Sequence, residues 1–186
     1  MTLLVLTDRR QARRPLVATV AAAVDGGALT VLLREKDLPR ERRFALAEEL
    51  RAILRPVGGR LIVAGNDPLG GDAVHLAADD PPPAGPVTWV GRSCHSAAEL
   101  ARASTVDYVT LSPVFPSASK PGYGPALGIP ELGRLVNRTP VRVFALGGIA
   151  CAAQAGACRE AGAAGVAAMG AVMRAADPAA VVRELL

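Results

Sequence analysis

The chain has 186 residues, of which 51% are hydrophobic and only 3% aromatic, and its formal net charge is +4. This length and apolar content suit one hydrophobic core, so we expect a single domain over residues 1–186. Scattered lysines and arginines with so few aromatic residues argue against a nucleic-acid-binding surface and favour small anionic ligands or a plain solvated surface.

Residue composition also bears on the cellular compartment. No apolar run is long enough to cross a membrane, and the first residues lead directly into a strand rather than a signal peptide. The three cysteines, Cys94, Cys151 and Cys158, are odd in number and lack CxxC spacing. This pattern predicts reduced thiols rather than a disulfide framework or a zinc site, and therefore a cytoplasmic protein that does not bind membranes.

Short apolar segments alternate with helical patterns along the chain. The expected strands are residues 3–6, 28–33, 61–64, 73–76, 87–90, 108–111, 141–146 and 165–169. The expected helices are residues 16–24, 41–54, 97–103, 129–136, 152–161 and 178–186, the last with Asp177 as N-cap. The gap between the third and fourth strands is too short for a crossover helix, and Pro81-Pro82-Pro83 interrupts the next connection. The third and fourth helices should therefore be stunted.

Eight nearly all-apolar strands, mostly separated by helices, predict an α/β fold, a compact (β/α)8 TIM barrel. A doubly wound open sheet is the alternative that this pattern leaves open. In a TIM barrel the active site lies at the C-terminal ends of the strands. Polar residues or glycines follow the predicted strands, so the candidate site is expected there.

The last three strand ends carry the features of an anion site. The loop after residue 111 is rich in proline and glycine and contains Ser117, Ser119 and Lys120. Small hydroxyls and an ammonium group just past a strand suit phosphate, although a proline-stiffened surface loop would contain similar residues. Gly147-Gly148 and Gly170 follow the last two strands, where backbone N–H groups at a helix N-terminus can bind phosphate.

Seven short pieces of the sequence together resemble one known family. They are Leu6-Thr7-Asp8, Leu33-Arg34-Glu35-Lys36, Val74-His75-Leu76 with Asp80, Gly91 to Ser96, Asp107 to Pro116, Gly147-Gly148-Ile149, and Gly165-Val166-Ala167. Their order and spacing resemble the thiamine phosphate synthase and thiazole tautomerase superfamily. The resemblance implies a TIM barrel, a thiazole-phosphate substrate and a place in thiamin biosynthesis. Synthases of this family join hydroxymethylpyrimidine diphosphate to thiazole phosphate and release pyrophosphate.

The resemblance also implies roles for residues at matching positions. The catalytic cations that act on the departing pyrophosphate would be Arg34, Lys36 and Lys120. The substrate and phosphate groups would contact Ser93, Ser117, Ser119, Gly147, Gly148 and Gly170. Magnesium would be bound by Asp80 and Asp67. His75 and His95 have simpler interpretations, as a core histidine and as a capping or solvated residue.

Departures from the synthase pattern leave alternatives open. Leu32 replaces a glutamine that contacts the pyrimidine, and Ala64-Gly65 stands where an Asn-Asp pair is usual, with Asn66-Asp67 two residues on. The loop has serines at 117 and 119 where threonines are usual. The segment 91–96 looks closer to the tautomerases, but their proposed histidine base is Pro113 here.

We therefore predict a transferase that resembles thiamine phosphate synthase. A thiazole tautomerase, and a non-catalytic barrel that binds thiazole or thiamin phosphates, are the alternatives. The expected partners are small phosphorylated substrates, and the sequence leaves a homo-oligomer open.

Overall fold

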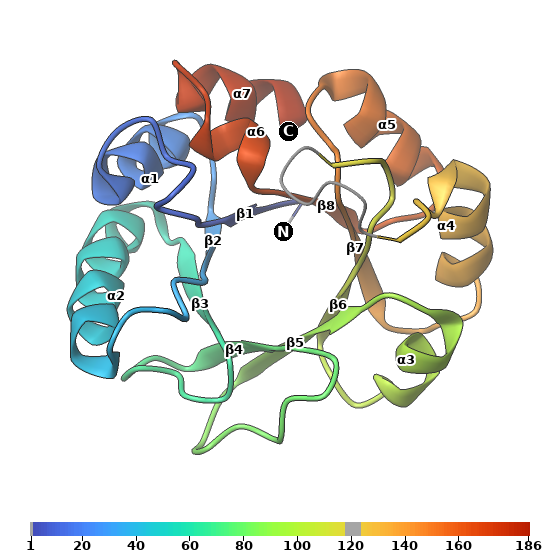
Figure 1. Cartoon of the computed structure of the whole chain (residues 1–186), viewed down its shortest axis with the longest axis horizontal. Coiled ribbons are helices and arrows are strands. Elements are labelled where there is room, and N and C mark those ends of the chain that lie inside the picture. Colours follow the sequence, from blue (N-terminus) through green and yellow to red (C-terminus); the bar gives the residue numbers. More distant parts are fainter. Residues whose placement is uncertain (1, 118–123) are drawn as a thin grey trace.

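Eight parallel strands form a closed barrel with helices on its outside in the computed structural model (Figure 1). The structure describes residues 2–117 and 124–186. The strands pair in chain order from β1 (Leu3–Leu6) to β8 (Gly165–Ala168), and β8 pairs in turn with β1. This closure confirms the predicted (β/α)8 barrel and rules out the open doubly wound sheet.

The remaining strands are β2 (Thr30–Leu33), β3 (Arg60–Ala64), β4 (Ala73–Leu76), β5 (Trp89–Cys94), β6 (Tyr108–Leu111) and β7 (Arg142–Leu146). The helices are α1 (Leu16–Asp25), α2 (Arg40–Leu54), α3 (Ala97–Arg102), α4 (Gly128–Val136), α5 (Ala152–Glu160), α6 (Gly170–Met173) and α7 (Pro178–Leu185). A 3-10 turn, η1 (Arg55–Val57), follows α2. Most bounds agree with the expected ranges to within two residues, but β5 extends four residues beyond 87–90. The short helix α6 is not indicated by the sequence pattern.

Two connections lack a helix altogether. Residues 65–72, between β3 and β4, and residues 77–88, between β4 and β5, contain only turns, bends and irregular backbone, and Figure 1 shows loops rather than helices beside these strands. Arg92 on β5 donates from Nη1 to the carbonyl oxygens of Ala77 and Ala78, at 3.0 and 2.7 Å. Its guanidinium thus satisfies backbone acceptors that no helix satisfies here. In the part of the chain that the structure describes, no helix is long and apolar enough to span a membrane.

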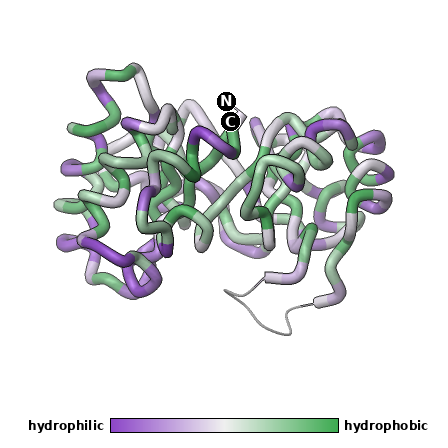
Figure 2. The backbone as a smooth tube through the Cα atoms, turned by 90° about the horizontal axis from the view of Figure 1, so that it is seen from above, coloured by the Kyte–Doolittle hydropathy of each residue, from purple (hydrophilic) through white to green (hydrophobic). Residues whose placement is uncertain are grey.

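Side-chain alternation along the strands divides the core into two layers. Inside the barrel lies one buried cluster: Leu4, Leu6, Leu32, Ile62, Ala64, Ala73, Tyr108, Phe144 and Ala167. Neighbouring strand residues such as Val5, Val31 and Val63 belong to a second cluster that includes the buried faces of the helices. In Figure 2 hydrophilic residues gather on outer segments, whereas the central segments are mostly hydrophobic. Strands buried on both faces explain why the sequence reads as nearly continuous apolar runs.

Candidate active site

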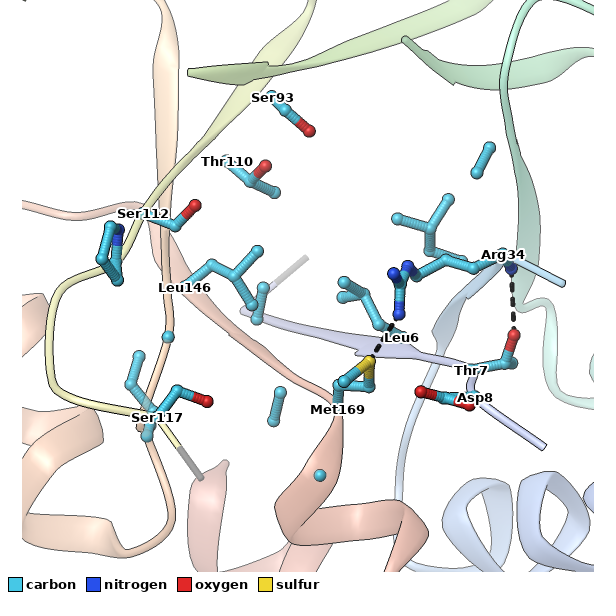
Figure 3. A pocket seen from close by; sticks show the side chains of 18 of the residues that line it. Leu6, Thr7, Asp8, Arg34, Ser93, Thr110, Ser112, Ser117, Leu146 and Met169 are labelled. Carbon is cyan, nitrogen blue, oxygen red and sulfur yellow. Dashed lines mark hydrogen bonds between the residues drawn. The ribbon is translucent and has the colours of Figure 1, made fainter. Parts of the chain in front are cut away.

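A cavity of about 760 Å³ lies at the C-terminal ends of the strands. Its floor is apolar, with Leu6, Leu32 and Leu146 among the lining residues. Figure 3 shows Ser93, Thr110 and Ser112 along one wall and Arg34 across from them, beside Met169. A concave site with an apolar interior and a few convergent polar groups is typical of a small-molecule site.

Arg34 and Lys36 both line this cavity. The backbone N–H of Arg34 donates to Thr7 Oγ1 at 3.0 Å, and its Nη1 lies 2.6 Å from Met169 Sδ (Figure 3). A thioether is a weak acceptor, so the guanidinium keeps its donors available for an anion. Lys36 Nζ lies 3.4 Å from Asp80 Oδ2, and the Lys36 side chain is 51% exposed. The two predicted cations therefore lie at the same cavity.

Glu35, between these two cations, ties the loop after β2 to the loop after β1. Its Oε1 accepts from the backbone N–H of Arg9 at 3.0 Å, and its Oε2 accepts from Arg9 Nη1 at 2.9 Å. Arg9 also pairs with Asp37, and its guanidinium holds the pKa of that carboxyl well below its usual range. Glu35 has φ 23°, which is uncommon for a residue other than glycine. Its buried carboxylate pairs with the partly exposed Arg9, which connects this turn to the loop after β1.

The opposite side of the cavity is built by backbone and hydroxyl groups. Ser117, Gly147, Gly148 and Gly170 all line the cavity. The loop after β6 runs beside the end of β7, because the Phe115 N–H donates to the carbonyl of Gly147 at 3.0 Å. A Cβ on Gly148 would lie 2.4 Å from the Pro116 carbonyl oxygen, so this close approach requires glycine there.

Two predicted site residues on this side cannot be placed. Ser119 and Lys120 fall in the range 118–123, outside the residues that the structure describes. Their roles stay predictions.

The predicted magnesium ligands have separate partners. Asp67 accepts from Arg40 Nε at 2.7 Å and from the Leu69 N–H at 2.9 Å. Asp80 accepts from the Ala77 N–H at 2.8 Å and pairs with Lys36. Neither aspartate lines the cavity, and within residues 2–117 and 124–186 no three His, Cys, Asp or Glu residues come together as a metal site. Each carboxylate is already paired with a cation, so the structure gives no support for magnesium at these two side chains, and magnesium binding stays a prediction.

Several polar residues of the cavity are absent from the predicted set. Thr7, Thr110 and Ser112 line it, as does His95, whose Nδ1 lies 3.0 Å from the Ser112 carbonyl oxygen. Thr110 and Ser112 follow Tyr108 at intervals of two residues, so they share the inward face of β6 and its extension. This alternation is the signal in the sequence that could have identified them.

His75 also lines the cavity, and it is only 5% exposed. Its Nε2 lies 3.0 Å from Ser93 Oγ and its Nδ1 lies 3.0 Å from Tyr108 Oη. Burial, reinforced by the nearby charges of Lys36 and Arg92, lowers the pKa of His75 to about 3. The imidazole is therefore neutral at physiological pH, as expected for a core histidine with satisfied nitrogens.

The cysteines take no visible part in the cavity. All three are free, and Cys94 and Cys158 are buried. Burial raises the pKa of each of these two thiols to about 11, so neither is a reactive thiolate at neutral pH.

Comparison with known proteins gives one consistent family. The family model described as thiamine monophosphate synthase matches residues 3–172. Thiamine-phosphate synthases from Roseiflexus castenholzii and Laribacter hongkongensis are 37% and 38% identical to the chain. These alignments cover 97% and 88% of this chain, and 85% and 82% of the relatives.

Solved structures agree with this result. A thiamine phosphate pyrophosphorylase from Pyrococcus furiosus superposes with a TM-score of 0.86 at 28% identity, covering 99% of this chain and 93% of that one. A 3-hexulose-6-phosphate synthase, with a TM-score of 0.66 and 17% identity over 100% of this chain and 98% of that one, shares the fold alone.

Proposed function

Since the chain belongs to the thiamine monophosphate synthase family, we propose that it is the transferase that joins hydroxymethylpyrimidine diphosphate to thiazole phosphate, giving thiamin phosphate and pyrophosphate. The observation that carries this proposal is the arrangement of one cavity. Arg34 and Lys36 lie on the side of β2, and hydroxyls and glycine backbone lie on the side of β6 to β8; Arg10 and Arg174 also line the cavity. Such a cavity can accept two anionic groups at opposite sides, as this reaction requires.

The chemical step fits the cations at the cavity. The bond between the pyrimidine methylene carbon and the diphosphate oxygen breaks, and its electron pair leaves with the diphosphate. The thiazole nitrogen then donates its lone pair to the methylene carbon and forms the new C–N bond. Negative charge grows on the leaving oxygens, where Arg34 and Lys36 can stabilise it. Each such contact contributes about 2–4 kcal/mol to lowering the barrier, by analogy with oxyanion donors.

The rest of the cavity would position the second substrate. The thiazole phosphate would contact Ser117 and the backbone N–H groups near Gly148 and Gly170, where glycine allows close approach. The apolar floor would hold the rings and limit access of water, which would otherwise compete with the thiazole nitrogen for the electrophilic carbon. Lys120 would add positive charge at the diphosphate. A cytoplasmic location is a further part of the proposal, which leaves the oligomeric state open.

A thiazole tautomerase is less well supported. Proline occupies position 113, where tautomerases have their proposed base, and a proton shift has no evident use for Arg34 and Lys36 at the cavity. The curated relatives named above are synthases rather than isomerases.

The direct test is incubation of the purified chain with both substrates and Mg2+, followed by measurement of thiamin phosphate. Reactions that lack either substrate are the controls, and parallel reactions without Mg2+ test the metal requirement. We expect product only when both substrates are present. Isomerisation of the thiazole alone would support a tautomerase, and binding without turnover would support a non-catalytic barrel. Either result would overturn the synthase assignment.

A further inference from the structure

A chain of hydrogen bonds crosses three neighbouring strands inside the barrel. Tyr108 Oη on β6 lies 3.0 Å from His75 Nδ1 on β4, and His75 Nε2 lies 3.0 Å from Ser93 Oγ on β5. Tyr108 is fully buried, with its ring edge against Phe144 at a centroid distance of 5.6 Å. His75 and Ser93 line the cavity, whereas Tyr108 does not. A ligand in the cavity can therefore reach the Ser93 end of these hydrogen bonds but not the Tyr108 end.

Gly91 makes this connection between non-adjacent strands geometrically feasible. In the strand register Gly91 pairs with His75 on one side and with Tyr108 on the other, so the three residues form one row across the sheet. A Cβ at Gly91 would lie 2.2 Å from Tyr108 Cζ and 2.5 Å from its Oη. The missing side chain on β5 therefore provides the space in which the Tyr108 ring reaches His75.

The need of each buried polar group for a partner fixes which residue donates and which accepts in the hydrogen bonds between Tyr108, His75 and Ser93. In a neutral imidazole one nitrogen donates and the other accepts. Among the described residues, the Tyr108 hydroxyl has one hydrogen-bond partner, His75 Nδ1. If Nδ1 carried the imidazole proton, the buried phenol proton would have no acceptor, which is costly. Tyr108 therefore donates to Nδ1, and the imidazole proton lies on Nε2.

The Nε2–H group then donates to Ser93 Oγ, with Thr110 Oγ1 as a second, longer acceptor at 3.4 Å. The Ser93 oxygen already accepts this bond, so its own proton is free to point into the cavity. We propose that Tyr108 and His75 are positioning residues that fix the Ser93 hydroxyl as a hydrogen-bond donor toward an anionic oxygen of the ligand. Neutrality of His75, which its lowered pKa supports, keeps this direction constant over the physiological pH range. The role rests on the proposed function, because the departing diphosphate is the anion that receives the Ser93 proton.

The tautomer can be measured without any ligand. Long-range 1H–15N spectra of the protein labelled with 15N-histidine report which ring nitrogen is protonated. The chain has two histidines, so a His75→Gln spectrum assigns the signals. We expect the Nε2–H form for His75 at neutral pH and Nδ1–H to be absent. An Nδ1–H tautomer, or a charged imidazolium, would overturn the proposed positioning of Ser93 by Tyr108 and His75, even if the enzyme is active.

The effect on the ligand is measured with inorganic pyrophosphate by titration calorimetry. Ser93→Ala and Tyr108→Phe should each weaken binding about tenfold, the loss expected for one hydrogen bond to a charged group. In the Ser93→Ala background, Tyr108→Phe should cause no further loss, because the hydroxyl of Tyr108 acts only through Ser93. The matched control is Val109→Ala, which trims a fully buried side chain of the same strand in the outer cluster and should leave pyrophosphate affinity unchanged.

The outcomes separate the two claims. Additive losses of pyrophosphate affinity in the double variant, or an equal loss in Val109→Ala, would show that Tyr108 does not act through Ser93. Either result would overturn the proposed positioning role. A wild-type protein that neither binds pyrophosphate nor forms thiamin phosphate would instead refute the proposed function, together with the ligand role of Ser93.

Discussion

Lowering the pH from 7 to 5 should destabilise the folded chain through His75. The ordinary histidine pKa is 6.5, whereas burial lowers that of His75 to about 3 in the folded state. Between these values the unfolded chain binds a proton that the folded chain does not bind. The free energy of unfolding therefore falls as the pH falls below 6.5, and it continues to fall until about pH 3. The two pKa values give a loss of about 2 kcal/mol between pH 7 and pH 5.

Carboxyl groups contribute to the same trend only at lower pH. The pKa values of Asp37, Asp67 and Asp80 are all lowered from 3.8, so the unfolded chain takes up their protons mainly below about pH 4. The cations Lys36 and Arg92 near His75 act against its protonation, and Asp80 acts for it. The interval from pH 7 to pH 5 therefore isolates the contribution of His75 from these carboxylates.

The assay is urea unfolding, followed by far-ultraviolet circular dichroism, at pH 7, 6 and 5. His75→Gln is the matched variant, because glutamine offers an amide that can hydrogen-bond but cannot take up a proton. We expect the wild type to lose about 2 kcal/mol over this interval and the variant to lose much less. Equal losses in the two proteins would refute the reasoning, whatever their absolute stabilities.

Three further outcomes are expected. Glu35→Gln weakens the ion pair with Arg9 that holds the loop carrying Arg34 and Lys36, so kcat/KM for thiamin phosphate formation should fall about tenfold. Unchanged kinetics would contradict this role. Gly91→Ala places a methyl group against the Tyr108 ring and should lower the free energy of unfolding by about 1–3 kcal/mol, whereas an unchanged urea midpoint would contradict the close contact. Cys151 is partly exposed while the other two cysteines are buried, so a thiol reagent should label one cysteine rapidly in the native protein, and rapid labelling of all three would refute the burial.

Local sequence patterns were sufficient for the barrel and for one side of the site. Each strand is a separate apolar run, and each full helix has its own apolar periodicity, so the order of elements could be predicted without knowledge of long-range contacts. The placement of Arg34 and Lys36 followed from their position directly after β2, because strand ends in a barrel meet at one mouth. The family resemblance then supplied their expected role.

Other features depend on contacts between distant residues and could not be predicted in this way. The strand β5 continues through Gly91, Arg92 and Ser93, which are not apolar because they face a tyrosine ring, loop carbonyls and the cavity, respectively. Asp67 and Asp80 form ion pairs with different residues, Arg40 and Lys36, which lie far from them in the sequence. Nothing in the local sequence around either aspartate specifies those pairings.

The central claim is that Lys36 and its neighbour Arg34 stabilise a departing diphosphate at this cavity. The most direct measurement is the steady-state rate of thiamin phosphate formation by the wild type and by Lys36→Ala, with Arg42→Ala as control. Arg42 is an exposed cation on α2 that does not line the cavity. We expect Lys36→Ala to slow turnover by roughly 10²-fold, which corresponds to about 2.7 kcal/mol of barrier, and Arg42→Ala to retain the wild-type rate. Equal rates in all three active proteins would contradict the claim.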